Sequence, residues 1–195
     1  MSLPQLNRAA DSFEFSTEER KLLLCLARES ILSAIEHREI SFDSPTAHLS
    51  ENRGVFTSLY LRSELRGCVG YALPATSVYR AVAETARAAA FDDTRFSPVT
   101  VDEAAELKIE LSILSPPQSM KAEAVEIGRH GLLITMAGQR GLLLPQVAIE
   151  HGWNRNTFLD QTCRKAGLAL KAWQQGATIE TFTAEIFGDE EHGGV

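Results

Sequence analysis

The spacing of apolar residues along the chain predicts helices and strands that follow one another without a repeating rhythm. Leu23, Ala27 and Ile31 recur every four residues, which is typical of the buried face of a helix. Ser16 and Glu19 form a capping box that starts this helix. Comparable patterns predict further helices near residues 76–91, 100–106, 145–151 and 154–166, strands at residues 55–61, 65–71, 107–114 and 178–187, and a hairpin at residues 125–136.

These elements do not alternate as repeated strand–helix–strand units. The pattern therefore favours an α+β fold, with a mixed or antiparallel sheet flanked by helices, over a doubly wound parallel sheet. The length of 195 residues and a hydrophobic share of 44% favour one domain with a buried core. We expect residues 1–15 to form a mobile lead-in, residues 16–188 the domain, and residues 189–195 an acidic tail.

The charge of the chain narrows the classes of function. A net charge of −7 argues against sequence-independent binding of nucleic acid and against a polybasic membrane patch, because both need clustered Lys and Arg. No run of about 18 apolar residues predicts a membrane span. The first residues also lack the basic and apolar regions of a signal peptide. We therefore expect a cytoplasmic protein.

Three scattered cysteines are too few for a disulfide scaffold or an all-cysteine zinc site. Cys25 and Cys163 fall on predicted helices among apolar neighbours, and we interpret both as core residues. The chain has no H-E-x-x-H or C-x-x-C motif and no phosphate-binding glycine loop. These absences lead us to expect neither a metal nor a cofactor.

The segment L-R-G-C-V-G at residues 65–70 is the most informative for chemistry. In an extended chain Arg66 and Cys68 lie on one face, so the guanidinium would favour the reactive thiolate form of the sulfur. Gly67 and Gly70 would let a substrate or another backbone approach closely. The alternative interpretation is that Cys68 is a small apolar plug in a strand.

Two other segments carry candidate polar chemistry. Arg95, in the segment 91–98, can bind an anion through two N–H groups of its guanidinium. The alternative is that the neighbouring aspartates pair with Arg95 and only fix the loop. His130 lies in the glycine-flanked turn 128–131, where it could act as a general acid or base or simply be an exposed turn residue.

Several segments in order along the chain resemble the AMMECR-type domain family, whose bacterial and archaeal branch is called protein A of the AmmeMemoRadiSam system. They are L-R-G-C-V-G at residues 65–70, A-A-F-D-D-T-R-F-S-P at 89–98, I-E-L-S at 109–112, G-R-H-G-L at 128–132, G-L-L-L-P-Q-V-A at 141–148, and residues 158–168 with Trp173. The resemblance spans about residues 16–188. It implies a larger and a smaller lobe with the L-R-G-C segment near a cleft between them, and it implies radical-SAM and Memo-type partner proteins.

Two main hypotheses follow. In the first, the protein binds a small molecule or peptide in that cleft, with Cys68 as the reactive thiol, His130 moving protons, and Arg66, Gly67, Gly70 and Arg95 binding the ligand. In the second, it is a non-catalytic binding module in which Cys68 is structural. A third and weaker hypothesis is an RNA-related role for a local patch of Arg62, Arg66 and Arg95, which the net charge disfavours.

Overall fold

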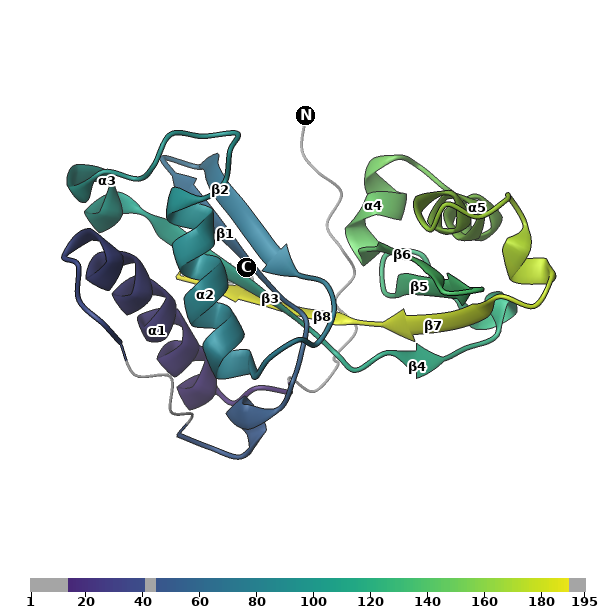
Figure 1. Cartoon of the computed structure of the whole chain (residues 1–195), viewed down its shortest axis with the longest axis horizontal. Helices are drawn as coiled ribbons and strands as arrows, with labels where there is room; N and C mark the ends of the chain where they lie inside the picture. Colours follow the sequence, from purple (N-terminus) through teal and green to yellow (C-terminus); the bar gives the residue numbers. More distant parts are fainter. Residues whose placement is uncertain (1–13, 41–44, 190–195) are drawn as a thin grey trace, which may run out of the picture. The chain divides into compact units, whose positions relative to one another are not determined.

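The computed structural model describes residues 14–40 and 45–189, which divide into two compact units. Residues 14–40, 45–114 and 185–189 form the larger unit, and residues 115–184 form the smaller unit. Among the described residues each unit has its own four-stranded antiparallel sheet packed with helices (Figure 1). The predicted α+β class is confirmed.

The larger unit is built on a sheet whose strands lie in the order β2-β1-β3-β8. Helices α1 and α2 lie side by side against one face of this sheet (Figure 1). The elements of this unit are α1 (Thr17–Ile35), η1 (His48–Ser50), β1 (Val55–Leu61), β2 (Glu64–Tyr71), α2 (Val78–Phe91), α3 (Val101–Glu106), β3 (Lys108–Leu114) and β8 (Ala184–Gly188).

Strand β1 shows why this sheet has two different faces. Val55 and Leu59 are fully buried, and they belong to the core that includes the buried residues of α1 and α2. Side chains alternate along a strand, so Ser58 and Tyr60 lie on the opposite face, where both are half-buried. The sheet therefore has one apolar face beneath the helices and one face that carries polar side chains.

The smaller unit has the strand order β4-β7-β5-β6. Its core contains Leu132 and Ile134 of an inner strand together with Phe158 and Cys163 of the longest helix in this unit. Cys163 is thus buried as predicted, whereas Cys25, which was also predicted to be a core residue, is exposed. Its elements are β4 (Gln118–Ser119), η2 (Ala122–Ala124), β5 (Gly131–Met136), β6 (Gln139–Leu143), α4 (Pro145–Glu150), α5 (Arg155–Lys165), η3 (Ala172–Gln174) and β7 (Thr178–Phe182).

Two predicted strand segments are arranged differently in the structure. The hairpin expected at residues 125–136 is instead formed by β5 and β6, which are joined at Ala137 and Gly138, both with positive φ. The single strand expected at residues 178–187 is divided at Thr183 into β7 and β8, which belong to different sheets. Alternation alone does not reveal such a division, because both halves have the same period of two.

The ends of the described chain are more firmly attached than the sequence suggested. Phe15, expected in a mobile lead-in, is 1% exposed and stacks on His48. Asp189, expected in the acidic tail, accepts a hydrogen bond from the Ile109 amide and pairs with Arg28. Residues 1–13 and 190–195 lie outside the described residues. No helix in the described part of the chain is long and apolar enough to cross a membrane.

Candidate functional site

Cys68 lies at one end of a polar row on the face of the larger sheet opposite α1 and α2. It pairs across the sheet with Ser58 of β1, and Ser58 pairs in turn with Glu110 of β3. Directly paired side chains share one face, so these three lie side by side. The Ser58 hydroxyl donates to Cys68 Sγ at 3.4 Å, and the Tyr60 hydroxyl donates to Glu110 Oε1 at 3.4 Å.

We name Ser58, Tyr60, Cys68 and Glu110 the thiol row. All four residues are half-buried. Burial above all, and then the negative charge of Glu110, raise the pKa of Tyr60 above its usual value. A hydrogen bond with Ser58 lowers the pKa of the phenol, while the hydrogen bond to Glu110 and the charge of Cys68 add smaller increases. Tyr60 therefore remains protonated, and able to donate, at neutral pH.

The main chain of Cys68 lies on the outer edge of the sheet, because β2 is an edge strand. Its amide donates to Asp93 Oδ2 at 2.9 Å, and its carbonyl accepts from Arg95 Nη2 at 3.2 Å. Asp93 and Arg95 are themselves joined at 2.6 Å. Such an arrangement satisfies an otherwise open strand edge. The aspartate–arginine pair therefore fixes the loop against β2.

The same pair holds the Arg95 guanidinium against the main chain of Cys68, 3.2 Å from its carbonyl oxygen. The hydrogen bond to Asp93 raises the pKa of Arg95 most, and the charge of Cys68 and a side-chain hydrogen bond to it also contribute. Conversely, the hydrogen bond from Arg95 holds the pKa of Asp93 well below its usual range, against the opposing effect of burial. The Arg95 side chain is 57% exposed, so a ligand can reach the guanidinium.

Arg66 has a different role from the one its spacing suggested. The register of β1 and β2 shifts next to it, so Arg66 has no cross-strand partner and strict alternation with Cys68 is broken. Its Nε donates to Glu103 at 3.0 Å and its Nη1 donates to the Ser97 carbonyl at 2.8 Å. This guanidinium, above all, lowers the pKa of Glu103 to about 2. Arg66 therefore binds the protein's own loop.

The two glycines of the segment are required by internal packing. A Cβ atom on Gly67 would lie 2.0 Å from the Ala89 carbonyl oxygen of α2. A Cβ atom on Gly70 would lie 2.3 Å from the ring of Phe56. The sequence left open whether a substrate or another part of the protein approaches these glycines. At both positions the close neighbour is the protein itself.

His130 belongs to the smaller unit, whereas Cys68, Arg66 and Arg95 belong to the larger unit. His130 is 7% exposed, so it is not an exposed turn residue. Its Nδ1 accepts a hydrogen bond from the Glu126 amide at 3.0 Å, and burial, the largest effect, lowers its pKa. The neutral ring thus closes the turn before β5. The role of His130 in proton transfer and the cleft between lobes stay predictions.

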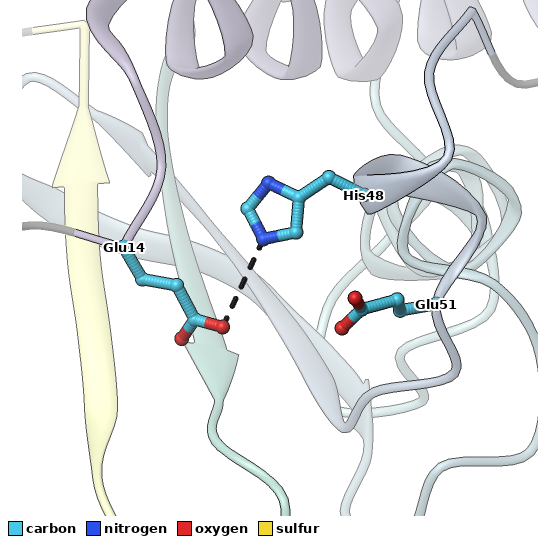
Figure 2. Close-up of side chains that lie close together, drawn as sticks. All are labelled: Glu14, His48 and Glu51. Carbon is cyan, nitrogen blue, oxygen red and sulfur yellow. Dashed lines mark ion pairs between the residues drawn. The ribbon is translucent and has the colours of Figure 1, made fainter.

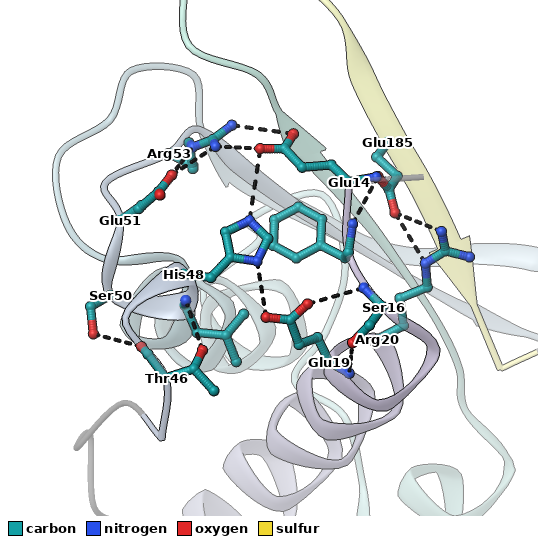
Figure 3. A network of polar contacts seen from close by, with 12 residues as sticks. Glu14, Ser16, Glu19, Arg20, Thr46, His48, Ser50, Glu51, Arg53 and Glu185 are labelled. Carbon is teal, nitrogen blue, oxygen red and sulfur yellow. Dashed lines mark hydrogen bonds and ion pairs between the residues drawn. The ribbon is translucent and has the colours of Figure 1, made fainter. Parts of the chain in front are cut away.

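The described residues contain one group with suitable spacing for a metal ion, and the sequence analysis did not single it out. Glu14, His48 and Glu51 each offer a ligand atom, all within 4.8 Å of one another (Figure 2). However, Arg53 pairs with both carboxylates, and His48 Nδ1 bonds to Glu19 Oε1 at 2.9 Å (Figure 3). The positive charge that a cation would supply is thus already supplied by Arg53.

This network is better explained as an attachment of the first described residues to the larger unit. The Glu14 amide donates to Glu185 of β8, which also pairs with Arg20 of α1 (Figure 3). His48 stacks on Phe15 with 4.6 Å between ring centroids. The contacts therefore join α1, η1 and β8 around the buried Phe15, at residues separate from the thiol row.

Comparisons with known proteins identify the family. A family model described as AMMECR1 matches residues 24–187, so the chain belongs to the AMMECR1 family. Protein MK0488 of Methanopyrus kandleri is 40% identical over 190 residues, which cover 91% of this chain and 92% of that protein. Protein TK0174 of Thermococcus kodakarensis is 38% identical over 193 residues, covering 91% and 94% respectively.

A solved structure agrees with this assignment. The crystal structure of the uncharacterized protein PH0010 from Pyrococcus horikoshii matches with a TM-score of 0.74 and 35% sequence identity. The match covers 91% of this chain and 95% of that chain. The family resemblance that the sequence motifs indicated is confirmed.

Sequence reasoning identified Cys68 and Arg95 as candidates but missed Ser58, Tyr60 and Glu110. A weak signal was present in β1, where Ser58 and Tyr60 occupy the alternate positions that face away from the core. Glu110 is more than 40 residues away along the chain, and only the pairing of β1 with β3 brings it to the thiol row.

Proposed function

We propose that the protein binds an anionic small molecule or peptide group at the thiol row and that Cys68 acts there as a nucleophile. Arg95 supplies the cation that attracts both the ligand and the ionised sulfur. A thiolate is the nucleophilic form of cysteine, and a nearby guanidinium favours it. The observation that carries this proposal is the contact of Arg95 with the main-chain carbonyl of the half-buried Cys68, with Asp93 holding the guanidinium in place.

The remaining contacts support the same proposal. Cys68 Sγ accepts a weak hydrogen bond from the Ser58 hydroxyl, whereas the main-chain groups of Cys68 are engaged by the loop at residues 93–95. The backbone is thus held rigidly while the sulfur keeps its capacity to react. Such an arrangement, a fixed main chain with an available side chain, is what a catalytic or binding group needs.

Iodoacetamide labelling of Cys68 at pH 7, followed by mass spectrometry, tests this proposal. The sulfur–carbon bond forms as iodide leaves, and the thiol proton passes to the buffer. We expect Arg95→Gln to lower the labelling rate by about 5- to 10-fold and Arg95→Lys to retain it within about 2-fold, because the lysine keeps the positive charge. Arg87→Gln, which removes an exposed arginine from α2, is the matched control. Equal rates in all four proteins would refute the proposal.

A second candidate function is a non-catalytic binding module. It is favoured by a specific observation: Arg66, Gly67 and Gly70 all have structural roles inside the larger unit. In this case Cys68 would also be structural, and the protein would act by docking onto radical-SAM or Memo-type partners. Co-purification of co-expressed proteins tests it, since binding that is unchanged in Cys68→Ala and Cys68→Ser would favour the module. Loss of partner binding in both variants would instead favour a direct role for the Cys68 thiol.

A further inference from the structure

The pair formed by Tyr60 and Glu110 lies on the same face of the larger sheet as Cys68, with Glu110 two strands away from the cysteine. Tyr60 extends from β1 on the face away from the buried core residues Val55 and Leu59. Glu110 extends from β3 on the same face, next to Ser58 in the sheet register. A proton donor, a carboxylate and a thiol thus lie on three adjacent strands.

We propose that Tyr60 is a catalytic acid that donates its phenolic proton to the oxygen of a carbonyl electrophile while Cys68 attacks it. This inference rests on the proposed function, and it specifies the ligand as an acyl or α,β-unsaturated carbonyl compound. Glu110 is the positioning residue, because it accepts the Tyr60 hydrogen bond and so orients the hydroxyl.

The protonation state of the pair suits this role. Burial and the charge of Glu110 raise the pKa of Tyr60, and an ionised Cys68 raises it further. Tyr60 therefore keeps its proton in the state in which the sulfur is nucleophilic. The hydrogen bond to Glu110 is long, at 3.4 Å, so the hydroxyl loses little when it turns to a stronger acceptor. A developing oxyanion is such an acceptor.

The step balances for an α,β-unsaturated amide. Cys68 first loses its proton to solvent, and the thiolate forms a bond to the β-carbon. The π electrons of the carbon–carbon double bond move to the α-carbon and carbonyl oxygen, which takes the proton of Tyr60. The phenolate regains a proton from solvent, and the enol becomes the saturated amide. One sulfur–carbon bond and one carbon–hydrogen bond replace the double bond and the thiol S–H bond.

The chain contains a matched tyrosine–glutamate pair without a thiol. Tyr71 of β2 donates to Glu84 of α2 at 3.2 Å, and burial also raises the pKa of Tyr71. Tyr71 pairs with Val55 and packs against the helix-side core. It therefore controls for the loss of a half-buried tyrosine hydroxyl on the same sheet.

Two small amide reagents distinguish proton donation from other effects. Acrylamide develops negative charge on its carbonyl oxygen when a thiolate adds, whereas iodoacetamide releases iodide and needs no proton donor. Rates at Cys68 are measured for wild type, Tyr60→Phe and Tyr71→Phe, with the exposed Cys25 as the reference within each sample. We expect Tyr60→Phe to lower the acrylamide rate by about 10-fold and to leave the iodoacetamide rate within about 2-fold. Tyr71→Phe should change neither rate.

Each other outcome has a definite meaning. An acrylamide rate unchanged in Tyr60→Phe overturns the inference, and so does an equal fall for both reagents, which indicates a general change of the site. Urea denaturation of each variant reports any loss of folding in the larger unit, and labelling of the buried Cys163 reports it in the smaller unit. If Arg95→Gln leaves the iodoacetamide rate at Cys68 unchanged, the proposed function itself fails, whatever the result for Tyr60.

Discussion

The two faces of the larger sheet carry similar polar side chains that differ in how completely the protein itself satisfies their hydrogen bonds. Thr57 is fully buried beneath the helices, and its hydroxyl lies 2.8 Å from that of Thr85 on α2, which also donates to the Ala81 carbonyl. The next residue, Ser58, faces the other way and contacts Cys68 through a weak hydrogen bond. Polar groups under the helices are satisfied by the protein itself, while those in the thiol row keep hydrogen-bonding capacity for a ligand.

The largest difference between the faces is expected at the two glycines of β2. In Gly67→Ala the new methyl group meets the backbone of α2 at Ala89, so the helix must move. In Gly70→Ala it meets chiefly the ring of Phe56, which can rotate, although the Val55 carbonyl is also close. We expect losses in the free energy of unfolding of about 3 kcal/mol for Gly67→Ala and about 1–2 kcal/mol for Gly70→Ala.

Urea denaturation measures both values. Equal losses for the two variants would show that the helix side is no more tightly packed than the thiol-row side.

The ion pair between Arg66 on the edge strand β2 and Glu103 on α3 predicts that the free energy of unfolding depends on pH. Arg66, above all, lowers the pKa of Glu103 to about 2 from its usual value of 4.5, so the folded state binds this proton less readily than the unfolded chain. The stabilisation is complete above pH 4.5 and is lost as pH falls toward 2. Because Glu103 is partly exposed, we expect it to contribute about 1–2 kcal/mol.

The matched variants are Glu103→Gln, which retains a capping-box side chain, and Glu106→Gln in the exposed pair with Arg62. Unfolding free energies measured from pH 6 to pH 2 should fall less steeply in Glu103→Gln than in the wild type, and Glu106→Gln should follow the wild type. An unchanged slope in Glu103→Gln contradicts the assignment.

The smallest expected effects compare adjacent residues of β1. Thr57→Val removes a buried hydroxyl that bonds to Thr85, and we expect it to reduce the free energy of unfolding by about 1 kcal/mol. Ser58→Ala, on the opposite face, should change stability by less than about 0.5 kcal/mol. Thermal and urea unfolding of the two variants measure this contrast. A larger loss in Ser58→Ala would mean that the thiol row is a structural network.

Local signals made much of the fold predictable. Capping boxes at Ser16 and Thr100 mark the starts of α1 and α3, because they satisfy helix amides within a few residues of sequence. Non-local features were not predictable. The division of the last strand at Thr183 follows from which sheet each half joins, and the burial of Phe15 depends on its stacking against His48.

The candidate site shows the same limit. Spacing suggested Arg66 as the cation near Cys68, but a change of register in β2 and the loop carbonyls redirect it, and Arg95 takes that place. Tyr60 and Glu110 were missed because only the pairing of β2, β1 and β3 brings them to the same face of the sheet as Cys68. A residue list from one segment therefore identified the thiol but not its partners.

The most direct test of the central claim compares the three cysteines within one folded wild-type sample. Limiting iodoacetamide at pH 7 is followed by mass spectrometry of each cysteine peptide. We expect Cys68 to react about 10-fold faster than the exposed Cys25, because Arg95 attracts the thiolate, while the buried Cys163, whose pKa is raised by burial, stays unlabelled. A Cys68 rate equal to or below that of Cys25 would contradict the account.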